Sequence, residues 1–229
     1  SAAHANFRTS TVKMAPYKSY NNAMKINFSN GNFSRAVLKW FAQHGRKHLP
    51  WQHNKTPYRV WLSEIMLQQT QVNTVIPYYE KFTTRFPTIH ALANAPVDEV
   101  LALWSGLGYY TRARNLHTCA QTIVRDHGGG FPHTVDGVSA LSGIGRSTAG
   151  AILSLSRNVN AAICDGNVKR VLCRVTGTKL YENLRQNEIQ LWQLAERLVP
   201  DNAADYNQAM MDIGATVCTR SKPDCAACP

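Results

Sequence analysis

Two carboxylates stand out in the sequence because of their surroundings. Glu64 is the first acidic residue of the chain and follows ten lysines and arginines between Arg8 and Arg59. It lies in an apolar stretch, WLSEIML, where partial burial would raise its pKa and make it a general acid. The same residues also allow an alternative without catalytic function, in which Arg59, Ser63 and Glu64 form a narrow, solvent-exposed strip of a helix.

Asp165 is the second carboxylate, and it directly precedes Gly166 and Asn167 in CDGNVKRVL. Aspartate is among the best residues for capping the start of a helix. A carboxylate at the positive end of a helix is expected to keep a low pKa. We therefore predict an ionised Asp165 that can stabilise a cation or orient a water molecule.

A glycine turn in LSGIGRSTAG, residues 141–150, precedes an apparent helix that starts close to Ser147. It is not a dinucleotide-binding motif, because no strand precedes it and Thr148 stands where a third glycine is needed. The amides around Gly143 and Gly145, together with the dipole of the next helix, would bind an anion. In a chain of net charge +11 we expect a DNA phosphate, although a plain helix–helix turn fits the spacing equally well.

The six cysteines fall into two groups. Three are scattered in apolar helical contexts and are predicted to be core residues: Cys119, Cys164 and Cys173. The others form a C-x6-C-x2-C pattern: Cys218, Cys225 and Cys228. Such short spacing is typical of iron–sulfur and zinc sites alike. No segment resembles a secretory signal, so a disulfide framework is not expected.

The elements that must position these groups are predicted to be helices. Apolar residues recur at helical spacing, and glycine and proline mark nearly every junction. The predicted helical segments are 33–45, 56–69, 73–87, 96–108, 109–129, 147–156, 167–175, 187–200 and 206–218. Only residues 158–164 could form a strand, and a single strand makes no sheet. The predicted class is all-α, and no apolar run is long enough to span a membrane.

From about Phe33 to Pro229 the chain resembles adenine DNA glycosylases of the MutY type, in the helix-hairpin-helix base-excision superfamily. The resemblance is carried, in order, by LPWQ, WLSEIMLQQTQV, GLGYYTRARNLH, LSGIGRSTAGAIL, DGNVKRVL and NQAMMDIGATVCTRSKPDCAACP. It implies a two-lobed all-α fold, with a six-helix lobe over residues 52–160. Residues 31–51 and 161–229 would form a second lobe with a 4Fe–4S cluster, and DNA would bind between the lobes.

The resemblance also implies a reaction, the hydrolytic removal of adenine mispaired with 8-oxoguanine or guanine. Glu64 would protonate adenine N7, and Asp165 would stabilise the sugar cation. Further residues are implied in contacts with DNA or with the extruded base: Trp51, Leu67, Gln69, Tyr109, Gly143, Gly145, Ser147 and Lys169. Of these, Leu67, Gln69 and Tyr109 would enter the duplex beside the oxidised guanine, and Trp51 would belong to the adenine pocket.

Ser147 decides between two kinds of related enzyme. Relatives of the endonuclease III type have a lysine at this position, whose amine attacks the sugar and leads to strand cleavage. Because a serine hydroxyl cannot form an imine, we expect a monofunctional enzyme that uses water. An endonuclease III-like glycosylase-lyase and a non-catalytic DNA-binding module are the alternatives. Ser142, where the family usually has proline, is expected to loosen the turn slightly.

The ends of the chain carry further expectations. Residues 1–30 are predicted to be a disordered tail or a segment added for expression, and an organellar transit segment has the same composition. Cys218, Cys225 and Cys228 match three cluster ligands, with a fourth expected beyond Pro229. A C-terminal domain for 8-oxoguanine recognition is expected to be absent. The resemblance implies a monomer that acts on double-stranded DNA in the cytoplasm, associated with the nucleoid and not with a membrane.

Overall fold

The computed structural model describes residues 31–179 and 184–229, and this part of the chain contains helices and no strand. The predicted tail, residues 1–30, lies outside the described residues. The helices are α1 (Asn32–His44), the 3₁₀ turn η2 (Pro50–Gln52), α2 (Pro57–Leu67), α3 (Val72–Arg85), α4 (Ile89–Asn94), α5 (Val97–Trp104), α6 (Tyr110–His127), α7 (Val135–Ser139), α8 (Arg146–Arg157), α9 (Gly166–Thr176), α10 (Leu184–Leu198) and α11 (Ala203–Thr216). Residues 158–164 are irregular, so the all-α prediction is confirmed.

Five of the described helices, α2, α4, α7, α9 and α11, start at a side-chain cap. The Thr56 side chain accepts a hydrogen bond from the Arg59 backbone N–H, and Pro57 occupies the first turn of α2. Asp165 caps α9 in the same way, as predicted from the sequence. Ser34 does not cap α1: Gly31 occupies that position, and the buried Ser34 hydroxyl donates to the Leu198 carbonyl at the end of α10.

Two short helices were not predicted from the sequence. The six residues of α4 and the five residues of α7 are too few to show a helical pattern of apolar residues. Both start at a threonine, Thr88 or Thr134, whose side chain accepts a backbone hydrogen bond. Seven α-helices therefore lie between residues 52 and 160, where the resemblance implied six. The expected division into two lobes stays a prediction.

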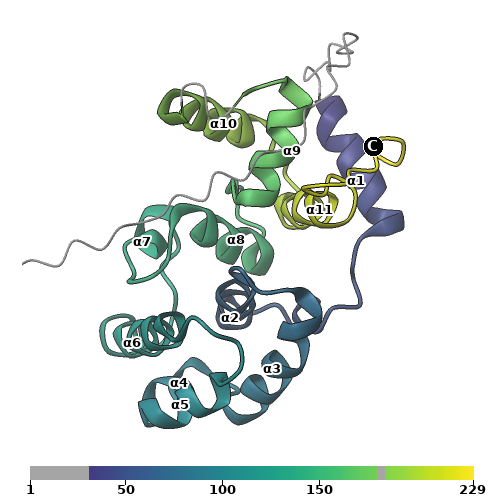
Figure 1. Ribbon diagram of the computed structural model, residues 1–229. Helices are drawn as coiled ribbons and strands as arrows, with labels where there is room; N and C mark the ends of the chain where they lie inside the picture. The colour runs from purple at the N-terminus through teal and green to yellow at the C-terminus, as the bar shows by residue number, and fades with distance from the viewer. Residues whose placement is uncertain (1–30, 180–183) are drawn as a thin grey trace, which may run out of the picture.

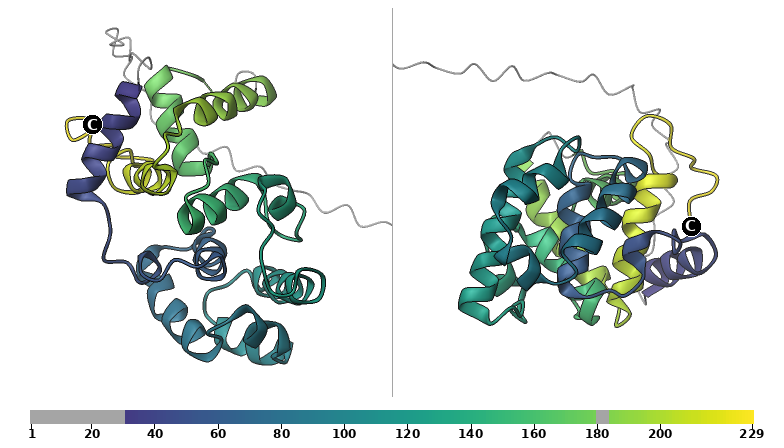
Figure 2. Two further views of the ribbon diagram at one scale, coloured as in Figure 1. Left: turned by 180° about the vertical axis from the view of Figure 1, so that it is seen from behind. Right: turned by 90° about the horizontal axis from the view of Figure 1, so that it is seen from below.

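The first and last described helices lie side by side. Figure 1 shows α1, in purple, against α11, in yellow, with α9 and α10 on the same side of the molecule, and both views of Figure 2 keep α1 beside α11. Helices α2 to α7 lie on the other side. Helix α8 packs against both α2 and α11 and so joins the two sides.

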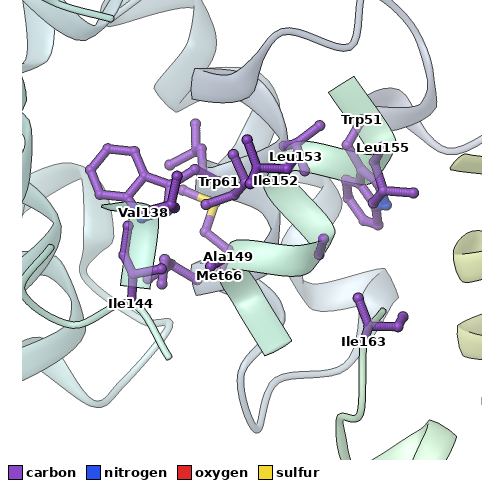
Figure 3. Close-up of a cluster of buried hydrophobic side chains, with 14 of the residues drawn as sticks. Trp51, Trp61, Met66, Val138, Ile144, Ala149, Ile152, Leu153, Leu155 and Ile163 are labelled. Atoms are coloured by element: carbon purple, nitrogen blue, oxygen red, sulfur yellow. The ribbon is translucent and has the colours of Figure 1, made fainter. Parts of the chain in front are cut away.

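The packing of α2 on α8 forms the part of the core that matters for the site. Trp61 and Met66 of α2 lie against Ala149, Ile152 and Leu153 of α8 (Figure 3), and all five are at most 1% exposed. Such a core holds its helices in fixed positions, because its side chains interlock at high density. The ends of α2 and α8 are therefore fixed relative to each other.

Gly150 allows a second close contact on α8. A Cβ atom at this position would lie 2.2 Å from the Ala162 carbonyl oxygen, so no larger residue fits without a backbone shift. The irregular segment 158–164 therefore runs directly over α8. This contact brings Asp165, which follows the segment, to the start of α8.

A buried ion pair fastens the opposite side. The Asp212 side chain of α11 is 0% exposed and accepts bonds from the Arg46 backbone N–H, Nε and Nη2 at 2.9, 2.9 and 2.7 Å. Gln208 adds a fourth donor at 3.0 Å. The carboxylate is thus fully paired, which a buried charge requires. Among the described helices, none has the length and apolar character needed to cross a bilayer.

Candidate active site

Glu64 lies in the third turn of α2 and is largely surrounded by apolar side chains. Burial, and to a smaller extent the charge of Asp165, raise its pKa to about 8. Within the described residues no hydrogen-bond donor contacts its carboxyl group. Ser63 is buried and donates to the Val60 carbonyl, so the alternative of a solvated strip is wrong. Glu64 is therefore mostly protonated at neutral pH, as a general acid must be.

Asp165 is held by the first turn of α9. Its Oδ1 accepts from the Val168 N–H at 2.8 Å, and its Oδ2 accepts from Asn167 Nδ2 at 3.3 Å. The predicted low pKa is nevertheless wrong. Burial raises the pKa of Asp165 and outweighs these bonds, which lower it. The charge of Asp165 is felt by Glu64, so the structure brings the two carboxylates together.

Ser147 links the start of α8 to the segment that carries Asp165. Its Oγ accepts a hydrogen bond from the Cys164 backbone N–H at 3.0 Å. The side chain is partly exposed, and Cys164 directly precedes Asp165. This contact places Ser147 next to the residue that precedes Asp165, and it gives the hydroxyl a structural partner that the sequence did not indicate.

The glycine turn forms a hairpin between α7 and α8. Gly143 has φ +78°, a left-handed conformation that favours glycine, and Ile144 is buried in the core (Figure 3). Gly145 occupies the cap position of α8 and has no side chain to bond the first amides of the helix. Those amides remain for a ligand, which suits an anion. Ser142 is exposed at the tip.

The residues expected to enter DNA lie at the end of α2, in the loop that follows it and in the loop before α6. Leu67 is the last residue of α2 and is partly exposed, and Gln69 follows it in an exposed loop. Tyr109 precedes α6 and is 61% exposed, a large fraction for an aromatic side chain. Gln69 and Tyr109 have φ values of +57° and +50°, which are uncommon for residues other than glycine. Both loops therefore carry strained, exposed residues.

Trp51 and Lys169 have surroundings that the sequence did not indicate. Trp51 is 6% exposed and packs edge-on against Tyr79, with ring centroids 5.6 Å apart. Its part in an adenine pocket stays a prediction. Lys169 is partly exposed and forms an ion pair with Glu188 of α10. The contact of Lys169 with DNA stays a prediction. For this contact the Lys169 ammonium group would have to leave the Glu188 carboxylate and bind a DNA phosphate.

The cysteine-rich segment follows α11. Burial raises the pKa of Cys228, and the charges of Cys218 and Cys225 raise it further, so the three thiols lie near one another. In residues 31–179 and 184–229, however, no group of three or more ligating side chains is arranged as a metal site. Arg174 Nη1 donates to Cys218 Sγ at 3.3 Å. Of the scattered cysteines, Cys119 and Cys164 are core residues, as predicted, whereas Cys173 is partly buried and packs against the core.

A chain of hydrogen bonds connects Asp165 with this segment. Arg170 Nη2 donates to the Oδ1 of Asn167 at 2.8 Å, and Asn167 in turn donates to Asp165. Arg170 Nε donates to the Cys218 carbonyl at 2.7 Å. Sequence reasoning missed Asn167 and Arg170, although their spacing of three residues on α9 is the usual signal of a side-chain pair on a helix.

Comparison with protein families adds to this geometry. The family model described as "HhH-GPD superfamily base excision DNA repair protein" matches residues 62–197, more than half of the chain. The chain belongs to this superfamily. The HhH-GPD match includes Glu64, Asp165 and the hairpin, so the residues that we assembled into one site lie within the family's own domain.

Several relatives of this HhH-GPD chain carry the same name. It is 52% identical over 198 residues to "Adenine DNA glycosylase" of Buchnera aphidicola subsp. Acyrthosiphon pisum, with 86% of this chain and 57% of the relative covered. It is 40% identical over 228 residues to "Adenine DNA glycosylase" of Mus musculus, with 95% of this chain and 43% of the relative covered. The chain thus spans about half the length of these relatives.

Solved structures share the fold. The structure of a thermostable thymine-DNA glycosylase superimposes with a TM-score of 0.78 and 32% sequence identity, covering 86% of this chain and 90% of the other. A non-covalent complex of endonuclease III with DNA gives a TM-score of 0.72 at 20% identity, covering 86% and 89%. The second likeness shows the fold alone. The predicted helix-hairpin-helix glycosylase fold is thereby confirmed.

Proposed function

We propose that this chain excises adenine mispaired with 8-oxoguanine or guanine in double-stranded DNA. The observation that carries the proposal is the position of Glu64, in an apolar environment that favours its protonated form and close to Asp165. A chain about half identical to an adenine DNA glycosylase has an acid and an anion close enough to interact. Adenine is a poor leaving group until it is protonated, and loss of the base leaves a cationic sugar. The two carboxyl groups match these two needs.

The proposed reaction proceeds in balanced steps. Glu64 donates its proton to adenine N7, and the N-glycosidic bond breaks with its electron pair moving to the base. The sugar becomes an oxocarbenium ion, which ionised Asp165 stabilises through its charge. Water adds to the anomeric carbon and loses a proton, leaving an abasic site in an uncut strand. The backbone amide of Val168 holds the Asp165 carboxylate in place throughout.

The remaining residues bind and open the duplex. The target base must leave the stack to reach the acid, and unstacking is favoured when a side chain fills the vacated space. Leu67, Gln69 and Tyr109 are exposed or partly exposed at the ends of two neighbouring loops, which suits this role. The hairpin amides around Gly143 and Gly145 would hold a backbone phosphate.

The cysteine-rich segment would hold a 4Fe–4S cluster. Cys218, Cys225 and Cys228 would supply three of the four thiolates that such a cluster requires, and Arg174 contacts the sulfur of the first of them. When bound, the cluster would cross-link the segment and supply no reacting group. Metal analysis of the purified chain tests this assignment: iron with bound sulfide supports it, whereas stoichiometric zinc without iron contradicts it.

Ser147 supports a monofunctional reaction. Its hydroxyl accepts a bond from the Cys164 amide and has no amine chemistry with which to capture the sugar. Water is therefore the nucleophile in the proposal. We further propose that the chain acts as a monomer. It would act on DNA in the cytoplasm, associated with the nucleoid.

Single-turnover incubation with an A:8-oxoguanine duplex tests the proposed function. We expect free adenine and a strand that breaks only after treatment with alkali. Matched A:T and T:G duplexes serve as controls, the latter because a thymine-DNA glycosylase shares the fold. Release of thymine in place of adenine would contradict the proposal. A covalent adduct trapped by borohydride would show the lyase alternative, and binding without base release would show the non-catalytic one.

A further inference from the structure

Arg112, in the first turn of α6, donates to the end of α2. Its Nη1 lies 2.9, 3.0 and 2.6 Å from the carbonyl oxygens of Ile65, Met66 and Gln68. The last carbonyls of a helix have no partner within the helix itself. Arg112 therefore supplies hydrogen-bond donors to the carbonyls at the end of α2, although it lies more than forty positions away in the chain.

The other terminal nitrogen of Arg112 joins this end to a second loop. Nη2 donates to Thr70 Oγ1 at 3.2 Å, and to the carbonyl oxygens of Leu107 and Gly108 at 3.3 Å each. Gln69 lies between two residues that Arg112 contacts on the first loop. All of these acceptors are neutral oxygens, so the guanidinium serves as a bridge between backbones and keeps its positive charge.

Arg112 also contacts the exposed aromatic residue of the second loop. Its guanidinium carbon lies 5.3 Å from the centroid of the Tyr109 ring and 5.5 Å from that of buried Trp104. A cation over an aromatic face is an attractive arrangement that also restricts the ring. The Tyr109 side chain is thus held from one face while most of its surface is exposed.

The two loops need such support because of their backbone. Gln69 and Tyr109 are two of the four described non-glycine residues with positive φ. Conformations of this kind persist only where the surroundings hold them, and they cluster at functional sites. Arg112 is bonded to the residue before Gln69 and to the residue before Tyr109. One side chain therefore supports both strained positions.

We infer that Arg112 is a positioning residue that holds Gln69 and Tyr109 together as one rigid element for opening the duplex. This inference rests on the proposed function. Arg112 acts through the two exposed residues and touches neither adenine nor sugar. Preformed geometry matters because a displacement of about 1 Å in a positioning residue can cost about a hundredfold in rate.

The same residue is close to the proposed phosphate site. A small pocket is lined by Trp61, Ile65, Gln68, Arg112, Asn115, Leu116, Ser142 and Gly143. Arg112 thus lies between the duplex-opening loops and the hairpin. The rigid element therefore lies at a fixed distance from the hairpin amides that would bind the DNA backbone. This distance would determine at which base pair, relative to the target nucleotide, the duplex opens.

Arg112→Lys is the informative substitution. Lysine keeps the charge and most of the length, but its three donors diverge from one nitrogen and cannot reproduce a planar fork that reaches two loops. Arg157→Lys is a matched control. Arg157 also bridges to backbone carbonyls, those of Phe131 and Pro132, but it does so at the far end of α8 from the hairpin.

The experiment compares two substrates and one optical signal. The first substrate is an A:8-oxoguanine duplex, and the second places the same adenine opposite an abasic analogue, where it is already unpaired. We expect Arg112→Lys to slow single-turnover excision from the first by about tenfold or more and from the second by less than about threefold. The fluorescence rise of 2-aminopurine at the target position should be lost in parallel. Arg157→Lys should change none of these, although both variants should lower the melting temperature similarly.

Three results would overturn the inference: an equal loss on both substrates, no loss on either, or an equal loss from Arg157→Lys. If Arg112→Lys does not fold, Thr70→Ala removes one acceptor of the bridge and should give the same pattern with a smaller amplitude. The fluorescence signal reports opening without bond cleavage. A wild-type chain that opens the duplex and releases no adenine would therefore disprove the proposed function and leave the role of Arg112 testable.

Discussion

Glu64 and Asp165 lie close together but have opposite kinds of surroundings. Glu64 is set among apolar side chains of α2, and within the described residues no donor contacts it. Asp165 accepts one backbone and one side-chain hydrogen bond at the start of α9. Burial raises the pKa of both groups, yet only Asp165 has bonds that oppose the rise. The contrast suits α2 to supply a proton and α9 to support a charge, as the proposed function requires.

Removal of the proton should have the largest effect. Glu64→Gln keeps the shape of the side chain but cannot deliver a proton to N7, so we expect adenine release to fall by about a thousandfold. DNA affinity, measured by fluorescence anisotropy, should stay within a few fold. A parallel loss of affinity and rate would instead assign Glu64 a structural role and break the contrast.

Removal of the charge should have the next largest effect. Asp165→Asn keeps a good helix cap but cannot stabilise the sugar cation, so single-turnover excision should fall by about a hundredfold. The melting temperature should change little, because asparagine can still accept from the Val168 amide. A large loss of stability with a matching loss of rate would mean that Asp165 acts mainly as a cap.

The pH dependence tests the contrast without mutation. Because the proton on Glu64 is needed and its pKa is about 8, excision should decline as pH rises through that value. Excision should also decline at acid pH, where protonation removes the charge of Asp165 that stabilises the sugar cation. In Asp165→Asn the remaining rate should decline at lower pH, since the charge of Asp165 raises the pKa of Glu64. Single-turnover rates at a series of pH values measure both. An unchanged midpoint would show that the two groups do not interact.

The smallest expected effect is a gain of function at the junction between the two regions. Ser147→Lys removes the acceptor of the Cys164 amide, at a cost of about 1 kcal/mol, and places an amine beside Asp165. We expect slight strand nicking and a covalent complex that borohydride traps on the A:8-oxoguanine duplex. Wild-type chain is the control and should yield no complex. Continued adenine release with no trapped complex from neutral to mildly alkaline pH would show that Ser147 is not beside the sugar.

The sequence predicted what depends on near neighbours. The position of Asp165 before Gly166 indicated its cap, and this prediction is confirmed. The apolar residues around Glu64 left two alternatives open, a partly buried acid and a solvated strip, and the structure agrees with the first. Helical periodicity indicated most of the described helices, but α4 and α7 were missed because each is shorter than two turns. The low pKa predicted for Asp165 was wrong. The sequence indicated the helix end, which lowers the pKa, but it did not indicate how far Asp165 is buried, which raises it.

The long-range bonds of the arginines could not be predicted. Arg112 reaches carbonyls 44 to 47 residues away, and Arg170 reaches Cys218 across 48 residues. Backbone carbonyls are present at every residue and leave no mark in the sequence. An arginine that binds them is therefore indistinguishable from one that faces solvent, until the fold shows which loops lie within reach.

The bond between Arg46 and Asp212 has a consequence for the order in which the molecule assembles. The two residues are separated by 166 positions, and α1 packs on α11. During synthesis from the N-terminus, α2 to α8 can associate on emerging from the ribosome, whereas α1 must wait until α11 has been made. The apolar face of α1 stays uncovered during this interval. A nascent chain that stalls before Asp212 is accordingly expected to bind chaperones through α1.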